Sequence, residues 1–174
     1  MRIVHAAWVA IGCGGPPPVA PAPPATPAFT IAADHCGPIA SHDVVTLTAL
    51  RALVAPDEVH PALGPSSVVL VVTRGATPAM YVMTNEDGTP FQVQVALPGI
   101  AVPALHLAVG APYHPGAGTI CPCWGPTLPA CYRGGDYLGV TLDATCSGSS
   151  AEPSDFDGLP VKTLVWRPGL FEPI

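Results

Sequence analysis

Three consecutive strands are predicted between residues 67 and 97, and they constrain the fold more than any other part of the sequence. The first is the apolar, β-branched run 68–72, which is short enough for a strand and is predicted to be covered on both faces. The second is 80–83, and the turn residues 85–88 lead into a third strand, 91–97, in which apolar and polar residues alternate. Alternation with a period of two places one face of that strand in the core and the other in water. The sequence therefore predicts an antiparallel sheet.

A single helix is predicted before these strands, at residues 43–54. Its apolar positions recur at helical spacing and are expected to face the sheet: Val44, Leu47, Leu50 and Val54. Ser41 is placed to cap the start of the helix, and Pro56 ends it. The alternative is a strand with Thr46 and Thr48 on its wet face, but that alternation breaks down further along the segment.

Other strands are predicted along the rest of the chain, at residues 29–32, 58–63, 105–109, 137–142 and 161–166. The segment 161–166 alternates and is expected to close the sheet. Residues 111–135 are rich in Pro, Gly and Cys and are predicted to be irregular, and 147–158 to be a polar loop. The predicted fold class is therefore α+β, a mainly antiparallel sheet with one helix packed on it and an irregular Cys-rich loop, in one domain over residues 29–174.

The N-terminus has the composition of a secretory signal. Arg2 is followed by a short apolar stretch and by small residues, and Ala10-Ile11-Gly12-Cys13 resembles the bacterial lipobox, in which the Cys is acylated. We expect residues 1–12 to be a signal peptide, Cys13 to carry lipid that attaches the protein to a membrane, and the Pro-rich residues 13–28 to form a tether. The alternative is a disordered leader with a chance Cys.

Charge and cysteine content indicate the compartment. The net charge is −6 and the basic residues are scattered, which argues against a nucleic-acid partner. Six cysteines indicate an oxidising compartment, in which disulfides form. We expect Cys123 to pair with Cys131, because the intervening loop contains Gly and Pro and reverses readily, with Cys121 as the competitor for Cys131. A second bridge is proposed between Cys36 and Cys146, although spacing alone does not determine connectivity.

No motif in the sequence points to a particular chemistry. Cys121, Cys123 and Cys131 with His114 form a conceivable zinc set, but one residue between paired cysteines is off the usual spacing. The pair His35-Cys36 is adjacent in sequence, so the two side chains are expected to point apart. Residues 155–158 lack the further ligands of a calcium loop. We therefore expect no catalytic residue, no metal site and no cofactor.

Two aromatic residues and one histidine are given structural roles. Trp166 and Tyr81 are predicted to fill the core, and His106 to be a structural residue on a strand.

An ordered set of short segments resembles one bacterial family. In chain order these segments are Gly37-Pro38-Ile39, Asp87-Gly88-Thr89, Pro98-Gly99-Ile100, Val109-Gly110-Ala111-Pro112-Tyr113 and the closing Val161-Lys162-Thr163-Leu164-Val165-Trp166-Arg167. Their order is similar to that in the RpoE-regulated (envelope-stress) lipoprotein family, over roughly residues 36–168. The resemblance implies a lipid-anchored α+β envelope domain with no assigned activity. The chain departs from the family after Gly110, where the family continues into a helix and this sequence has residues 114–118, which forbid one.

The function expected from the sequence is that of a non-enzymatic lipoprotein of the bacterial envelope, facing the periplasm or attached to the outer membrane. Its sheet domain would bind an unknown envelope protein or ligand, or support the envelope. The alternative is a secreted enzyme or metal-binding protein that uses the Cys-rich loop 113–135. A third hypothesis, a carrier of small apolar ligands, would require an enclosed apolar pocket.

Overall fold

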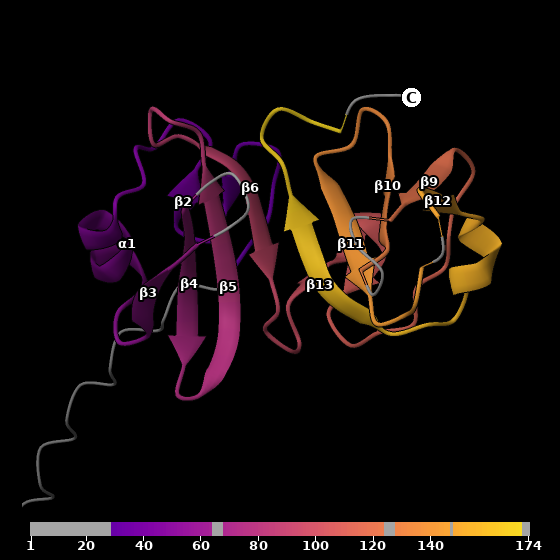
Figure 1. Cartoon of the computed structure of the whole chain (residues 1–174), viewed down its shortest axis with the longest axis horizontal. Helices are drawn as coiled ribbons and strands as arrows, with labels where there is room; N and C mark the ends of the chain where they lie inside the picture. The colour runs from indigo at the N-terminus through magenta and orange to yellow at the C-terminus, as the bar shows by residue number, and fades with distance from the viewer. Residues whose placement is uncertain (1–28, 64–67, 124–127, 147, 172–174) are drawn as a thin grey trace, which may run out of the picture.

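The computed structural model describes residues 29–63, 68–123, 128–146 and 148–171, which form one sheet with smaller elements around it (Figure 1). The nine strands of the sheet are β3 (Glu58–Leu63), β4 (Val68–Arg74), β5 (Thr77–Thr84), β6 (Pro90–Val95), β9 (Thr119–Pro122), β10 (Ala130–Arg133), β11 (Leu138–Leu142), β12 (Ser150–Ala151) and β13 (Val161–Trp166). The other elements are β1 (His35–Cys36), β2 (Ile39–Ala40), α1 (Leu47–Val54), β7 (Ala101–Val102), η1 (Pro103–Leu105), β8 (Leu107–Ala108) and η2 (Pro153–Phe156). The predicted α+β class is confirmed. Within the described residues, no helix has the length and apolar character needed to cross a bilayer.

The strand order places the last strand in the middle of the sheet. The order is β12-β9-β10-β11-β13-β6-β5-β4-β3, and every pair of neighbours in it is antiparallel. Figure 1 shows β13 between the group β3–β6 and the group β9–β12. The prediction that residues 161–166 close the sheet is therefore wrong. A strand with neighbours on both sides is buried more fully than an edge strand, and four consecutive residues of β13, from Thr163 to Trp166, are buried.

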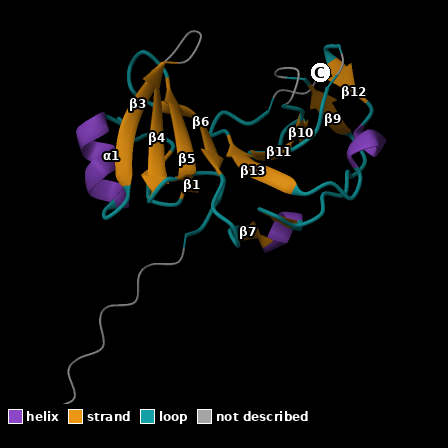
Figure 2. Ribbon diagram, turned by 60° about the horizontal axis from the view of Figure 1, so that its bottom comes forward, coloured by secondary structure: helices purple, strands orange, loops and turns teal. Residues whose placement is uncertain are grey.

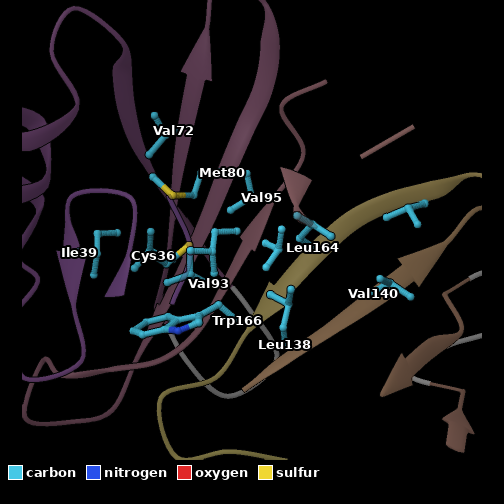
Figure 3. Close-up of a cluster of buried hydrophobic side chains, with 14 of the residues drawn as sticks. Cys36, Ile39, Val72, Met80, Val93, Val95, Leu138, Val140, Leu164 and Trp166 are labelled. Atoms are coloured by element: carbon cyan, nitrogen blue, oxygen red, sulfur yellow. The ribbon is translucent and has the colours of Figure 1, made fainter. Parts of the chain in front are cut away.

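The core consists of two rows of apolar side chains that cross the sheet in register. The first row runs through the paired residues Val140, Leu164, Val95, Met80, Val72 and Val59. The second runs through Leu138, Trp166, Val93, Val82 and Leu70. All eleven side chains are buried, and Figure 3 shows members of both rows on one side of the sheet. Paired neighbours on one face are the contacts through which a sheet is stabilised, so these rows join the two groups of strands into one core.

The N-terminal hairpin covers this core. Cys36 on β1 and Ile39 on β2 are fully buried beside Val93 and Trp166 (Figure 3). The indole Nε1 of Trp166 donates a hydrogen bond of 2.7 Å to the carbonyl oxygen of Ala32, which satisfies its one polar group. The prediction that Trp166 fills the core is confirmed. A second ribbon, β7 with β8, lies apart from the hairpin and below β13 in Figure 2.

The helix exists but begins later than predicted. α1 starts at Leu47, and its N-cap is Thr46, whose hydroxyl accepts from the amide of Ala49 at 3.1 Å. The amide of Val45 donates to the carbonyl of Gly88, which holds this residue outside the helix and buries its side chain, whereas Val44 is 59% exposed. The predictions of a helix start at residue 43, a Ser41 cap and a buried Val44 are therefore wrong.

The helix protects the open edge of the sheet. α1 lies beside β3, with Leu50 fully buried (Figure 1). Arg51 donates from Nη2 to the carbonyl oxygen of Val59 on β3 at 3.1 Å, and Pro61 two residues further has no amide hydrogen to offer. A capped carbonyl and a proline both reduce the tendency of an edge strand to pair with another chain.

The second face of the sheet is more open than predicted. Leu70 and Val72 of β4 face the core, while Val69 and Val71 between them are only half-buried on the other face. Tyr81 lies beside Val71 in register and is also half-buried. The predictions that residues 68–72 are covered on both faces and that Tyr81 fills the core are wrong, because the described residues leave the side chains on this face partly exposed.

Two regions predicted to be irregular or extended differ from expectation. The Cys-rich region contains β9 and β10, which pair with each other and with the rest of the sheet. His106 is exposed, with φ 54°, and follows η1 in a left-handed turn, so the prediction that it lies on a strand is wrong. The structure has β8 (Leu107–Ala108) within the predicted strand 105–109, and the strand is shorter than predicted because the left-handed turn at His106 precedes it.

Candidate functional site

The disulfides link other partners than those predicted. Cys121 pairs with Cys131, and Cys123 with Cys146. The predicted Cys123–Cys131 and Cys36–Cys146 bridges are therefore wrong. The register explains the first error: Ile120 opposes Tyr132 across β9 and β10, which brings Cys121 opposite Cys131. In the described part of the chain, Cys36 has no disulfide partner and is fully buried in the core, where burial raises the pKa of its thiol.

This pairing removes the ligands of the conceivable zinc set. Cys121, Cys123 and Cys131 are all oxidised, and a zinc ligand must be a thiolate. Nδ1 of His114 instead donates to a carboxylate oxygen of Asp157 at 2.9 Å. Over residues 29–63, 68–123, 128–146 and 148–171, no group of three or more His, Cys, Asp or Glu side chains is arranged to hold a metal ion.

An apolar pocket of about 500 Å³ lies between the N-terminal hairpin, the end of α1 and the ends of β4 and β5. We call it the hairpin pocket; its lining includes Phe29, Pro38, Leu53, Met80 and Ile100. The charged groups that line it are paired with each other, because Arg74 donates to both carboxylate oxygens of Asp57, at 3.1 Å from Nε and 2.8 Å from Nη2. The volume suits a small ligand, but among the described lining residues the charges of Arg74 and Asp57 neutralise each other.

A chain of hydrogen bonds at the mouth of the hairpin pocket has the order of a hydrolase triad. The hydroxyl of Thr30 is 3.0 Å from Nε2 of His35, and Nδ1 of His35 is 2.9 Å from a carboxylate oxygen of Asp34. The hydrogen bond with His35 lowers the pKa of Asp34. The carboxylate side chain is 82% exposed, so water screens it, unlike the buried carboxylate that orients a catalytic histidine. We therefore assign these bonds to closing the hairpin.

A second cavity, of about 700 Å³, has a more polar lining. We call it the Arg167 cavity; it is lined by Ser41, Asn85, Thr89, Pro90, Phe91, Tyr132, Arg167, Pro168, Gly169 and Leu170. The lining comes from four distant parts of the chain: the segment after β2, the β5–β6 turn with the start of β6, Tyr132 of β10, and the segment after β13. Backbone hydrogen bonds hold the last of these in place, from Arg167 to Tyr137 and from Phe171 to Asp136, both at 2.9 Å.

Arg167 differs from the other cationic side chains of the described residues in its partners. Four of the five described Arg and Lys side chains contact an oxygen: Arg51 with Val59, Arg74 with Asp57, Arg133 with Asp136 and Lys162 with Asp143. The guanidinium carbon of Arg167 lies instead 5.2 Å from the centre of the Phe171 ring, which stacks on Tyr132 at 4.1 Å. This stack orients the guanidinium by a cation–π contact and leaves its donors for another partner.

The turn between β5 and β6 orients the other polar groups. Asn85 donates through Nδ2 to the hydroxyl of Thr89 at 3.0 Å, and that hydroxyl donates to Asp87 at 2.6 Å. The Thr89 hydroxyl and amide hold the pKa of Asp87 below its usual range. The amide oxygen of Asn85 and one of its N–H groups remain for a further partner. The cavity therefore combines a cation, hydroxyl groups and an amide with the half-buried ring of Phe91.

Sequence reasoning did not identify this cavity. Cys13, the predicted lipidation site, lies outside the described residues. Arg167 belongs to the closing segment of the family resemblance, and Asp87 and Thr89 belong to an earlier segment of it, but the sequence predicts a binding role for none of the three. The sequence does show that one of the matching segments ends at Arg167 and that another, 87–89, lies in a turn. That these two segments line one cavity follows from the strand order of the sheet.

The fold and cavity together define a class: a disulfide-linked α+β domain with a nine-stranded antiparallel main sheet and a polar cavity beside the central strand of that sheet. A solved structure with this fold is the uncharacterized protein yfeY from Escherichia coli, which is 17% identical in sequence, with a TM-score of 0.56 over 75% of this chain and 94% of that chain. This likeness shows the fold. No family model matches the chain, and neither does the sequence of any curated protein.

Proposed function

We propose that the chain is a lipid-anchored protein of the bacterial cell envelope, facing the periplasm, whose sheet domain is a non-catalytic binding module. The Arg167 cavity is the proposed binding site. The observation that carries the binding role is Arg167 itself, a half-buried cation whose contact among the described residues is an aromatic ring and not an anion. A cation held in this way in a cavity is suited to bind an anionic group.

A binding role is better supported than a catalytic one at this cavity. Its described lining contains the hydroxyl groups of Ser41 and Thr89, but no His, Asp, Glu or Lys that would act as a general base beside them. An unactivated hydroxyl is a weak nucleophile. The hairpin pocket has the apolar lining that the hypothesis of an apolar carrier requires, but it is partly open to solvent and not enclosed.

The proposed envelope location is supported by three features of the chain. The lipobox-like Ala10-Ile11-Gly12-Cys13 precedes a Pro-rich segment, and four of the cysteines of the domain form disulfides, which persist in oxidising compartments. The order of short segments shared with the envelope-stress lipoproteins supports the same location.

Membrane fractionation tests the anchor. We expect Cys13→Ala to move the protein from the membrane pellet to the soluble fraction and to abolish incorporation of a labelled fatty acid, because the acylated atom is removed. Cys36→Ala is the matched control: it also removes one thiol, but from the core of the domain, and should leave both fractionation and labelling unchanged. An equal distribution of Cys13→Ala and the wild-type chain would contradict the anchor.

A further inference from the structure

We propose that the Arg167 cavity binds a saccharide that carries a single carboxylate, such as a uronic acid unit. This inference deepens the proposed function and rests on it in taking the Arg167 cavity as the binding site.

The charge of the cavity favours a monoanion. Arg167 supplies one positive charge, and the hydroxyl of Thr89 in the lining already donates to the carboxylate of Asp87. A carboxylate carries one negative charge, which a single guanidinium balances. A phosphate monoester carries a charge of about −1.5 to −2 at neutral pH, and it would leave an excess negative charge close to Asp87.

The geometry of a guanidinium favours a planar anion. The fork of N–H donors of an arginine matches the two oxygens of a carboxylate and binds them with two parallel hydrogen bonds. The contact of Arg167 with the Phe171 ring, at 5.2 Å, restrains the plane of the guanidinium before a ligand arrives. A restrained side chain loses less conformational entropy on binding than a free one.

The remaining lining favours a ligand rich in hydroxyl groups. Hydroxyl groups both donate and accept hydrogen bonds, and the cavity offers groups of both kinds from Ser41, Thr89 and Asn85. The half-buried ring of Phe91 provides an apolar surface against which the C–H groups of a sugar ring can pack. The volume of about 700 Å³ is within the range of small-molecule sites.

Binding is tested by NMR titration of the full-length Cys13→Ala chain, labelled with ¹⁵N. The probes are a disaccharide with one uronic acid, its neutral counterpart with CH₂OH in place of the carboxylate, a sugar phosphate, and the dipeptide Ala-Ala with its free carboxylate. We expect the uronic acid probe to shift amides of residues 85–91 and 167–170 and to bind at least about tenfold more tightly than its neutral counterpart, which is the effect of one charge-assisted hydrogen-bonded pair.

Three variants separate a specific site from general electrostatic attraction. Arg167→Gln should abolish the preference for the uronic acid, and Arg167→Lys should weaken it, because lysine keeps the charge but loses the fork. Lys162→Gln is the matched control, since it makes the same change in net charge at an exposed residue paired with Asp143, and it should bind like the unchanged chain. If Arg167→Gln does not fold, Phe91→Leu provides a second test, because it keeps an apolar side chain but removes the ring. It should lower the affinity for the uronic acid probe and for its neutral counterpart by the same factor.

Several outcomes would overturn the inference: equal affinity for the uronic acid and its neutral counterpart, tighter binding of the phosphate or of Ala-Ala, shifts confined to other residues, or unchanged binding by Arg167→Gln. Because every titration uses a chain that lacks the acylation site, a negative result here leaves the lipid anchor standing. Conversely, if fractionation shows no membrane anchor at Cys13, the result of the binding titration is unaffected.

Discussion

At the scale of single residues, the turn of the N-terminal hairpin depends on a glycine for two separate reasons. Gly37 has φ +58°, and a Cβ built there would clash with the ring of Phe29. Gly75 has nearly the same φ, +62°, but a Cβ there would meet no atom within 4 Å. The two positions therefore separate the backbone cost of a side chain from its steric cost.

We expect Gly37→Ala to lower the free energy of unfolding by about 2–5 kcal/mol, of which about 1–2 comes from the left-handed backbone and about 1–3 from the clash with Phe29. Gly75→Ala should lose only the backbone part. Urea unfolding of both variants measures the difference. In a chain that also carries Phe29→Leu, Gly37→Ala should lower the free energy of unfolding by less, whereas the effect of Gly75→Ala should not change. Equal destabilisation by Gly37→Ala and Gly75→Ala in the wild-type chain would show that the close approach of Phe29 does not contribute to the cost.

At the scale of elements, α1 contributes to stability through one face. Leu50 is fully buried and Leu53, on the same helix, is 46% exposed. We expect Leu50→Ala to cost about 2–5 kcal/mol, the range for a large apolar side chain removed from a core, and Leu53→Ala to cost well under half of that. Thermal unfolding followed by circular dichroism measures both. A larger loss at Leu53 would mean that the helix packs by another face.

The disulfide connectivity between strands is tested by removing cysteines in pairs. In Cys121→Ser with Cys131→Ser, the bridge between Cys123 and Cys146 should persist, so neither thiol should react with a labelling reagent after denaturation without reductant. In Cys123→Ser with Cys131→Ser, both remaining partners, Cys121 and Cys146, should be labelled. Labelling of Cys123 in the first variant, together with protection of Cys146 in both variants, would instead support the connectivity first predicted from spacing. Loss of either native bridge should destabilise the chain by about 3 kcal/mol in the chain-entropy model.

At the scale of the whole molecule, β13 joins the two groups of strands. It pairs with β11 on one side and with β6 on the other, and it contributes Leu164 to the first row of the core and Trp166 to the second. A chain that ends after residue 160 should show no cooperative unfolding transition and no near-ultraviolet circular dichroism, because the rows are interrupted at their centre. A chain that ends after Pro168 keeps β13 and loses the buried Phe171, so it should unfold cooperatively at lower urea concentration. Cooperative unfolding of the shorter chain would contradict a single core.

The sequence alone determined the elements whose signal is local. The strands at β4, β5 and β6, the turn at residues 85–88, the end of α1 before Pro56 and the burial of Leu50 all follow from the period of apolar residues and from turn chemistry, which act over a few residues. The start of the helix did not follow in this way, because Val45 is held by a hydrogen bond to Gly88, which is distant in sequence.

Only the tertiary structure decided how these elements meet. A run such as 161–166 has the same local pattern at the edge of a sheet or at its centre, and its place depends on which neighbours bury both of its sides. The partner of Cys131 depends on the register of β9 against β10, and one shift of two residues would have exchanged Cys121 for Cys123. The Arg167 cavity follows from the strand order, since the central position of β13 brings Arg167 to the turn that carries Asn85 and to Ser41 after the first hairpin. Contacts between residues so far apart along the chain are selected by the burial of the whole core, and no short segment of the sequence specifies them.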